Sequence, residues 1–436
     1  MTRPDVAVVG AGVAGLAAAA RLAEAGRSVL LLEARPRLGG RIHTIIDPGS
    51  GFPIELGAEF IQGRSAELFE IAKRGHLGLV PFTERHASLR GGRAQSFPDV
   101  IELVDRLLKS RRPGSADITV AQILNQQLGT GTDIEELTAI RGYLEKFHAA
   151  DLGRFGVEAL AENQAAEEED GDGIYRLSQG YGSLVEELRQ RLDSGSVEVR
   201  TQCIVGHIRW KEGEVQIEAD TPQGREKIEV ARAILAVPLS VLKLERQEQG
   251  AVILDPEPPG WKSGLGALHM GAAQRIVLQF ERAWWNEAGR PVPTFVHGRD
   301  EPLPVWWTAT PRDVPFITGW VGGPQAETLA GIPAEKMTRL GVQSLASIFG
   351  QSVSRVEGWL RASYTHDWSR DPFSRGAYSY GGVGASAAAE LLRRPVRNTL
   401  FLTGEAVNGQ GRNATVPGAL ASGLRTAALV LDEVHE

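Results

Sequence analysis

The N-terminal segment constrains the fold most, because its apolar residues and glycines follow one strand–turn–helix–strand pattern. Residues 6–9 predict a short buried strand, residues 13–25 an alanine-rich helix, and residues 28–33 a second parallel strand. The turn before the helix holds three glycines in the G-x-G-x-x-G spacing: Gly10, Gly12 and Gly15. Such glycines permit a tight turn, close approach of a phosphate, and close packing of helix on strand. The segment predicts a dinucleotide-binding βαβ unit with the diphosphate at the helix N-terminus; the alternative is a glycine-rich structural turn.

A carboxylate ends the second strand, and a second glycine pair follows it. Glu33 lies 23 residues after Gly10, a distance at which an acidic side chain accepts hydrogen bonds from a ribose. Two arginines and two glycines come next: Arg35, Gly39, Gly40 and Arg41. Glycines let the backbone approach an aromatic ring system, and an arginine binds a phosphate through two hydrogen bonds. A plain NAD-binding unit does not need these residues, so the segment indicates a larger cofactor.

Composition and charge argue against several classes of protein. The chain has 436 residues, enough for two intertwined domains. Its net charge is −7, and the sequence has no block of lysines or arginines of the kind that binds nucleic acid. The single cysteine, Cys203, fits a reducing compartment and a role as a small buried apolar residue. No apolar run reaches the ~18 to 20 residues that span a bilayer, and no His or Cys cluster has metal-ligand spacing. We expect a cytoplasmic protein without a membrane span, a metal or a nucleic-acid partner.

The first half of the remaining chain is predominantly helical in pattern. Apolar residues recur at helical spacing over 65–194, with loops expected near 83–99, 111–118 and 165–180. The acidic run EEEDGD at 167–172 predicts a solvated loop, with a cation-attracting rim as the alternative.

The second half turns to strands. Residues 197–236 alternate in polarity, with a hairpin that turns near Gly213. Residues 246–375 carry eight of the nine tryptophans and predict antiparallel strands with a helix near 334–349. The C-terminal end returns to a strand, a loop and a helix. No repeat or linker separates these parts, so two interleaved domains are expected.

Seven segments, spread in order along the whole chain, resemble the flavin amine oxidases: VVGAGVAGLAAAARL, EARPRLGGR, ELGAEFIQG, LSQGYGSLVEEL, AILAVPLSVL, DPFSRGAYSY and LFLTGEAVNGQGRNATVPGALASGLRTAA. This group includes monoamine, polyamine and L-amino-acid oxidases and a histone demethylase. The resemblance implies FAD as the cofactor and an α/β fold, in which a Rossmann-like FAD-binding domain is interleaved with a mixed α+β substrate domain. We expect the FAD-binding domain at residues 1–84, 176–245 and 376–436, and the substrate-binding domain at 85–175 and 246–375.

The resemblance also assigns residues to FAD. In the N-terminal unit these are Gly10, Gly12 and Gly15 at the diphosphate turn, Glu33 and Arg35 at the adenosine ribose, and Gly39, Gly40 and Arg41 along the diphosphate and flavin. Elsewhere they are Gly57 and Ala58 near the flavin, Val205 at the adenine, Gly404 and Glu405 at the ribityl or diphosphate end, and Thr415 and Val416 at the flavin O2/N1 edge. A helix N-terminus at that edge would stabilise the negative charge of reduced flavin.

On the reaction side, the resemblance implies an aromatic wall and one cation that faces the flavin. Tyr378 and Trp368 match family positions near the flavin, where aromatic rings can hold an amine; the alternative for both is a place in the core. Arg275 stands where family members carry a lysine near flavin N5. Strand alternation puts Arg275, Val277 and Gln279 on one face, and the alternative for Arg275 is the surface. These three residues, Arg275, Tyr378 and Trp368, are the catalytic candidates.

Three residues depart from the family pattern. Arg275 keeps the positive charge of the lysine but cannot lose its proton, which sets the usual oxidase kinetics in question. Gln62 stands where polyamine-type members often carry an ionisable residue, so it weakens a polyamine assignment, although Gln62 and Tyr378 are both candidates for substrate binding. Ala377 replaces the cysteine of covalently flavinylated members, so FAD is expected to be non-covalent. Glu59 and Asp371 are further candidates for substrate contacts.

The function that follows is an FAD-dependent oxidase of an amine or amino acid. A hydride would leave the carbon next to nitrogen for flavin N5, and oxygen would reoxidise the flavin and give hydrogen peroxide. No second nucleotide site is visible in the sequence, which argues against an NAD(P)H-driven monooxygenase, although a redox partner protein could replace oxygen. The alternatives are a flavin dehydrogenase or desaturase that acts on a carbon–carbon bond, and a flavin-binding module without turnover. The sequence leaves open whether the chain forms a homodimer.

Overall fold

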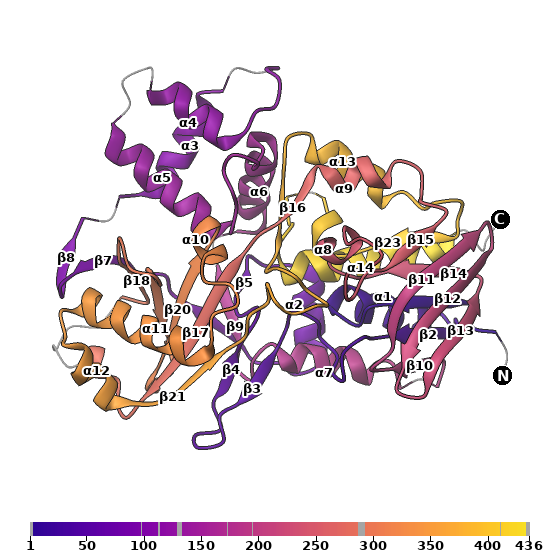
Figure 1. The fold of residues 1–436 in the computed structure, drawn as a ribbon, viewed down its shortest axis with the longest axis horizontal. Helices are drawn as coiled ribbons and strands as arrows, with labels where there is room; N and C mark the ends of the chain where they lie inside the picture. Colours follow the sequence, from indigo (N-terminus) through magenta and orange to yellow (C-terminus); the bar gives the residue numbers. More distant parts are fainter. Residues whose placement is uncertain are drawn as a thin grey trace.

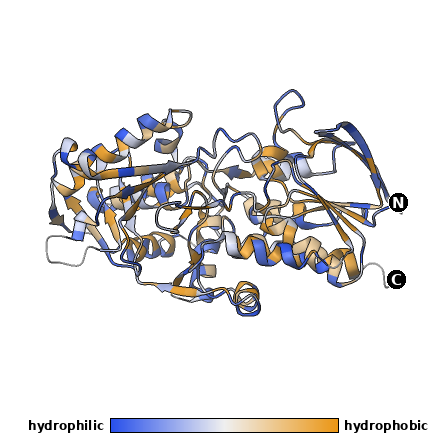
Figure 2. Ribbon diagram, turned by 90° about the horizontal axis from the view of Figure 1, so that it is seen from below, coloured by the Kyte–Doolittle hydropathy of each residue, from blue (hydrophilic) through white to orange (hydrophobic). Residues whose placement is uncertain are grey.

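A computed structural model describes residues 3–96, 98–111, 114–128, 133–171, 173–193, 195–286, 293–409 and 411–432. The parallel sheet that carries the N-terminal strand lies on one side of the molecule, and a large, mainly antiparallel sheet with its covering helices lies on the other (Figure 1). Hydrophilic and hydrophobic residues are interleaved along the helices and strands (Figure 2).

The parallel sheet confirms the predicted Rossmann-like α/β fold. Its strands follow the order β10 (Val197–Arg200), β2 (Val29–Leu32), β1 (Val6–Val9), β14 (Arg232–Leu235) and β23 (Leu400–Leu402). The residues of β1 and β2 are all buried. Helices α1 (Val13–Glu24) and α14 (Val416–Asp432) cover one face of these strands, and apolar residues between 203 and 230 cover the other. The carboxyl ends of β1 and β2 therefore open onto the start of α1, where a dinucleotide is held in such folds.

A second, smaller sheet lies next to the first and contains the predicted hairpin. Its order is β13 (Gly224–Val230), β12 (Glu214–Thr221), β11 (Ile204–Lys211) and β15 (Ile253–Asp255). Gly213 turns the hairpin with a φ of +71°, a conformation that glycine adopts without strain. Cys203 is buried just before β11, as expected of a small apolar residue.

The large sheet is built mostly from the tryptophan-rich region. Its order is β21 (Leu360–Thr365), β17 (Ala273–Phe280), β20 (Phe316–Gly322), β19 (Val305–Thr308), β18 (Phe295–His297), β7 (His86–Arg90) and β8 (Arg93–Gln95). Helix α11 (Ala334–Phe349), predicted from its spacing, covers the face that carries Ile276 and Leu278. The alternation predicted for β17 is confirmed, since Val277 packs in a different cluster from Ile276 and Leu278.

Short sheets and further helices complete the fold. The strands are β3 (Thr44–Ile46) with β4 (Pro53–Glu55); β5 (Ile61–Gln62), β9 (Ile174–Leu177) and β6 (Leu79–Phe82); and β16 (Leu268–Met270) with β22 (Ser379–Gly381). The helices are α2 (Ala66–Arg74), α3 (Val100–Lys109), α4 (Val120–Leu128), α5 (Ile134–Phe147), α6 (Val157–Asp170), α7 (Gly182–Gln190), α8 (Leu239–Leu242), α9 (Trp261–Gly266), α10 (Pro324–Glu327), α12 (Val353–Trp359) and α13 (Ala385–Arg393). Two 3₁₀ turns lie at η1 (Trp284–Asn286) and η2 (Glu405–Val407).

Two of the expected loops are wrong. The segment 83–99 contains the β7–β8 hairpin, because β7 pairs in parallel with β18 more than two hundred residues later. The segment 165–180 contains the end of α6 and all of β9, which pairs with β5 and β6. Long-range pairing of this kind leaves little local signal in the sequence. The boundaries of the two domains stay a prediction. In the part of the chain that the structure describes, the helices are too short or too polar to cross a membrane.

Candidate functional site

One cavity of about 2280 Å³ runs from the end of β1 to the large sheet. It brings together almost all of the predicted site residues. Those on its lining are Gly10, Gly12, Glu33, Arg35, Gly39, Gly40, Arg41, Gly57, Ala58, Gln62, Val205, Arg275, Trp368, Tyr378, Gly404, Glu405, Thr415 and Val416. Gly15 is not on the lining, since a Cβ there would stand 1.9 Å from the carbonyl oxygen of Gly10. Gly15 therefore serves the packing of α1 on the sheet.

The glycine turn leaves room and free donors at the start of α1. Gly10 has a φ of +101°, which a residue with a side chain rarely adopts. Gly12 is the N-cap of α1, and within the described chain neither a side chain caps it nor any atom lies within 4 Å of a Cβ built on it. The first N–H groups of α1 thus face open cavity, where a diphosphate fits. These residues fit the nucleotide half of FAD.

Glu33 is held by backbone donors from both sides of the turn. Its carboxylate accepts hydrogen bonds from the N–H of Ala11 at 2.8 Å and of Arg35 at 2.9 Å, and the residue is only 3% exposed. Because the carboxylate also lines the cavity, it remains placed to meet a ribose. This position fits the role predicted for Glu33.

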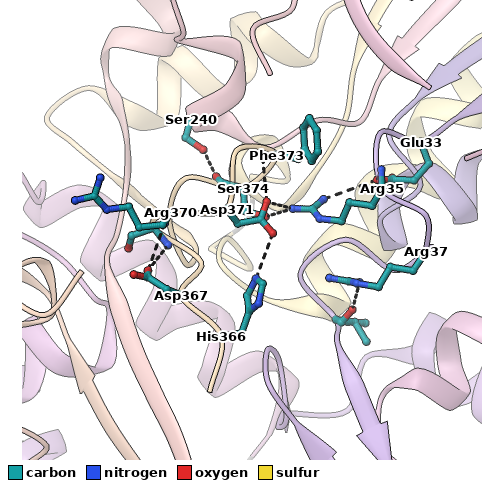
Figure 3. Close-up of polar contacts among 12 residues, drawn as sticks. Glu33, Arg35, Arg37, Ser240, His366, Asp367, Arg370, Asp371, Phe373 and Ser374 are labelled. Atoms are coloured by element: carbon teal, nitrogen blue, oxygen red, sulfur yellow. Dashed lines mark hydrogen bonds and ion pairs between the residues drawn. The ribbon is translucent and has the colours of Figure 1, made fainter. Parts of the chain in front are cut away.

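The Arg35 guanidinium lies 3.8 Å from the Glu33 carboxylate and extends toward a distant loop (Figure 3). Its guanidinium donates to Asp371 at 2.5 Å and to the hydroxyl of Ser374 at 2.8 Å. Asp371 is buried, which opposes its ionisation, but hydrogen bonds and charge from His366 and Arg35 lower its pKa to about 2. Asp371 is therefore engaged by Arg35, which leaves little of it for a substrate, and the sequence did not predict this tie.

Arg41 forms a second tie between the nucleotide segment and the same loop. Its guanidinium donates to Glu405 at 2.8 Å and to the carbonyl oxygen of Ala377 at 2.9 Å. Glu405 also accepts from the Ser379 hydroxyl at 2.5 Å and from the Ala414 N–H at 2.9 Å. Glu405 thus joins Arg41 to the residues that lead into α14. Its predicted place at the ribityl or diphosphate end stays a prediction.

Arg275 lies buried at the other end of the cavity. It is 5% exposed, so the surface alternative is wrong. One terminal nitrogen donates to the carbonyl oxygen of Gly57 at 2.9 Å, the other pairs with Glu59, and the guanidinium lies 5.4 Å from the ring centre of Trp307. The remaining donor, Nε, is buried and has no hydrogen-bond partner among the described residues.

Glu59 is shared between two arginines. It pairs with Arg275 and, at 2.7 Å, with Arg176, and it accepts from the indole N–H of Trp307 at 3.0 Å. Burial opposes ionisation, yet the two guanidiniums hold the pKa of Glu59 below its ordinary value. A carboxylate so fully engaged is not available as a substrate contact, so that candidate role of Glu59 is not supported.

Aromatic rings form the wall beside Arg275. Tyr378 lines the cavity and lies parallel to Trp320, with the ring centres 6.4 Å apart and an interplanar angle of 3°. Its hydroxyl donates to the carbonyl oxygen of Phe147 at 2.7 Å, which fixes the ring. Trp320 and Phe147 were not predicted, and the tryptophan-rich composition of 246–375 was the only sequence signal for such a wall.

Trp368 supports the turn near Gly57. Its indole N–H donates to the carbonyl oxygen of Leu56 at 2.7 Å, and a Cβ on Gly57 would stand 3.2 Å from its ring. The residue is 6% exposed and so combines a core position with a place on the cavity lining. Direct contact of Trp368 with a substrate stays a prediction.

The outer part of the cavity carries many carboxylates. Those nearest the end of α6 are Glu84, Glu167, Glu168 and Asp170. The predicted loop at 167–172 is wrong for 167–170, which end helix α6, although 167–169 are solvent-exposed as expected; residue 172 lies outside the described residues. Arg412, a cation in this part of the lining, is paired with Asp170 at 2.7 Å. The cation-attracting rim that the sequence offered as an alternative stays a prediction.

A cradle for a dinucleotide that opens into an aromatic cavity with a buried arginine defines a flavin-dependent oxidoreductase. The family described as flavin containing amine oxidoreductase matches residues 13–431, so this chain belongs to that family. It is an FAD-dependent amine oxidoreductase, and non-covalent FAD is typical of its family.

Curated relatives cover almost the whole chain at low identity. The chain is 28% identical over 98% of its length to Lysine-specific histone demethylase 1 homolog 2 of Oryza sativa subsp. japonica, and it covers 57% of that protein. It is 26% identical over 97% of its length to Polyamine oxidase 2 of Arabidopsis thaliana, and it covers 87% of that protein. The chain spans only 30% of another relative, Lysine-specific histone demethylase 1 homolog 3 of Arabidopsis thaliana.

A solved structure shows the same fold. Wild-type putrescine oxidase bound to putrescine superposes on this chain with a TM-score of 0.81, at 23% sequence identity, over 100% of this chain and 99% of that one. At this identity the likeness concerns the fold.

Proposed function

We propose that this chain is an FAD-dependent amine oxidase that oxidises the carbon next to a neutral nitrogen of an amine, to give an imine, and passes the two electrons through the flavin to oxygen, which gives hydrogen peroxide. The observation that carries the proposal is the continuity of the cavity. Its lining includes the nucleotide cradle at Gly12 and Glu33 and, without interruption, Arg275 and Tyr378. Bound FAD would supply the hydride acceptor at its N5.

The residues of the chain orient the amine and exclude water. Tyr378 and Trp320 offer flat apolar faces that can hold the body of an amine. The ring of Tyr378 cannot swing away while its hydroxyl is bonded to Phe147. Arg275 adds a fixed positive charge at a buried position, where such a charge stabilises developing negative charge strongly.

Charge on the lining favours an amine over an amino acid. A substrate carboxylate needs a free arginine that binds it through two hydrogen bonds, and both terminal nitrogens of Arg275 are engaged by Gly57 and Glu59. The carboxylates of Glu84 and Glu168 instead suit a positive charge on another nitrogen of the substrate, whereas desolvation in the cavity and the charge of Glu84 raise the pKa of the neighbouring Glu167 to about 7. The names of the relatives, a polyamine oxidase and a putrescine oxidase, support a diamine or polyamine. Gln62, which weakened that assignment in the sequence, is one neutral residue on a lining rich in acids.

The test is a substrate panel on the FAD-loaded protein. Putrescine, spermine, benzylamine and leucine are mixed with it first without oxygen, to follow loss of oxidised-flavin absorbance, and then with oxygen, to follow peroxide. We expect loss of absorbance and peroxide with the diamine or polyamine and little with leucine. Absorbance loss without peroxide would indicate a partner protein as the electron acceptor. Reduction only by a non-amine would support the carbon–carbon dehydrogenase, and no reduction by any compound would support the silent flavin module.

A further inference from the structure

A group of charged side chains at the inner end of the cavity is assembled from three separate segments. Arg275 comes from β17, Arg176 from β9, and Glu59 from the turn after β4. The side chains are only 6%, 13% and 12% exposed, respectively. Burying charges is costly unless they are paired, so their presence at one end of a cavity requires an explanation.

The pairing leaves Arg275 incompletely neutralised. Glu59 places one carboxylate oxygen on Arg275 and the other, at 2.7 Å, on Arg176, so two guanidiniums share one negative charge. Arg176 is held in turn by the carbonyl oxygens of Thr310 and Thr308, at 2.7 and 3.2 Å. Arg275 and Glu59 line the main cavity, whereas Arg176 does not.

The direction of Arg275 is fixed from three sides. Gly57 accepts from one terminal nitrogen, Glu59 pairs with the other, and Trp307 lies under the plane of the guanidinium. Only Nε remains without a partner in the described chain. The Gly57 turn itself rests on the nucleotide segment, because a Cβ on Gly57 would stand 1.9 Å from the carbonyl oxygen of Arg41.

We propose that Glu59 and Arg176 are positioning residues for Arg275: Glu59 holds the guanidinium beside the flavin, and Arg176 draws off part of the charge of Glu59 so that Arg275 presents a net positive charge to the cavity. This inference rests on the proposed function, which puts the flavin ring at this end. The positive charge would then act on the flavin ring itself. The effect of each residue on the flavin should then depend on the sign of the residue's charge. Residues with a merely structural role would show no such dependence.

One more titratable group interacts with Arg275 and Glu59, and its effect must be distinguished from theirs. Glu55, on β4, is buried and accepts from the Tyr181 N–H at 2.6 Å and the Thr44 hydroxyl at 2.7 Å. It interacts electrostatically with Arg275 and Glu59 but does not line the main cavity. All measurements are therefore made at one fixed pH, and Glu55→Gln is included to measure the effect of Glu55 on the flavin.

The experiment uses sulfite, an anion that adds to oxidised flavin and abolishes its absorbance near the visible maximum. Its dissociation constant reports the charge beside the flavin and needs no amine substrate. A pair of charges at close range in a protein interacts strongly, so Arg275→Met should weaken sulfite binding by about tenfold or more and Arg176→Met by roughly threefold. Glu59→Gln, which removes a negative charge but keeps an acceptor for Arg275, should tighten it by roughly threefold or more.

A double variant guards against loss of folding. Glu59→Gln leaves two guanidiniums without a carboxylate, a change that destabilises a buried site strongly. Glu59→Gln combined with Arg176→Met removes one charge of each sign, keeps Arg275, and should bind sulfite within about twofold of the unmodified protein. Glu187→Gln is the matched control, because Glu187 pairs with Arg191 at 2.9 Å on α7, away from the cavity.

Each outcome decides the inference. Opposite shifts for Glu59→Gln and Arg176→Met, with no shift for Glu187→Gln, would support it. Shifts in the same direction would indicate a structural role and overturn it, as would unchanged sulfite binding in Arg275→Met. If sulfite binding follows the expected pattern but no compound in the amine panel reduces the flavin, the inference stands and the proposed amine oxidation fails.

Discussion

The nucleotide end and the reaction end of the cavity are built in different ways. At the nucleotide end, backbone groups shape the glycine turn: Glu33 accepts from the N–H of Ala11 and Arg35, and Gly39 donates to Ala11 at 2.8 Å. Arg35 and Arg41 also reach residues far along the chain. At the reaction end, side chains from distant elements meet, and Arg275 bonds to Gly57 from 218 residues away. The glycine turn of the nucleotide end requires positions without side chains, whereas the reaction end requires particular charged side chains at particular positions.

The largest effect should come from adding a single methyl group at the nucleotide end. Gly15→Ala would place a Cβ 1.9 Å from the carbonyl oxygen of Gly10, so we expect a loss of stability of at least ~1 to 3 kcal/mol, as for an overpacked core. Gly12→Ala has open space around its Cβ, so the apoprotein should keep its stability and lose FAD affinity. Thermal unfolding of the apoproteins and FAD titration check both. Equal stability of the two variants would contradict the assignment of Gly15 to helix packing and of Gly12 to cofactor binding.

The next effect concerns the ribose. Glu33→Gln keeps the size of the side chain and removes its charge, so a ribose loses a charge-assisted acceptor that contributes about 1.5 to 3 kcal/mol. The glutamine side chain can also direct its own N–H at one of the two backbone donors, which weakens the local structure and further lowers FAD affinity. FAD released by acid precipitation, compared with the unmodified protein at equal chain concentration, measures retention. Unchanged retention would remove Glu33 from the cofactor site.

The difference between the two ends explains how far the sequence could predict them. The βαβ unit, the positions of Gly10 and Gly12, and the role of Gly15 follow from local spacing, because backbone conformation is a local property. The sequence showed that position 275 holds an arginine where the family carries a lysine. It did not show the ion pair between Arg275 and Glu59, since nothing in the sequence places Glu59 and Arg176 together. The β7–β8 hairpin was missed for the same reason, because its partner β18 lies far along the chain.

A smaller effect should separate the two functions of Tyr378. Tyr378→Phe keeps the ring parallel to Trp320 but removes the hydrogen bond to Phe147, which contributes about 0.5 to 1.5 kcal/mol. We expect a modest fall in kcat/KM for an active amine, with FAD content unchanged. Tyr378→Ala removes the wall and should lower kcat/KM much further. If both variants keep full kcat/KM, Tyr378 belongs to the core and not to the substrate wall.

A separate effect concerns the pH dependence of stability. Burial raises the pKa of Glu55 from its ordinary 4.5 to about 7, although Thr44 and Tyr181 donate to it. Between these two values the folded chain keeps a proton that the unfolded chain has lost, so this group makes the folded state less stable as the pH rises through that window. Glu55→Gln should remove this part of the slope. Urea unfolding midpoints across the window check it, and an unchanged slope in the variant would show that Glu55 titrates normally.

The most direct test of the account is whether Arg275 acts on the flavin. The FAD-loaded protein is photoreduced without any substrate and mixed with oxygenated buffer in a stopped-flow instrument. A fixed positive charge should stabilise the negative charge that develops during reoxidation, so Arg275→Met should reoxidise roughly tenfold more slowly or worse. Arg275→Lys should keep part of the rate and add a pH-dependent step, because a buried lysine can lose its proton. If Arg275→Met reoxidises as fast as the unmodified protein, the flavin does not lie against the reaction end, and the two ends of the cavity do not form one active site.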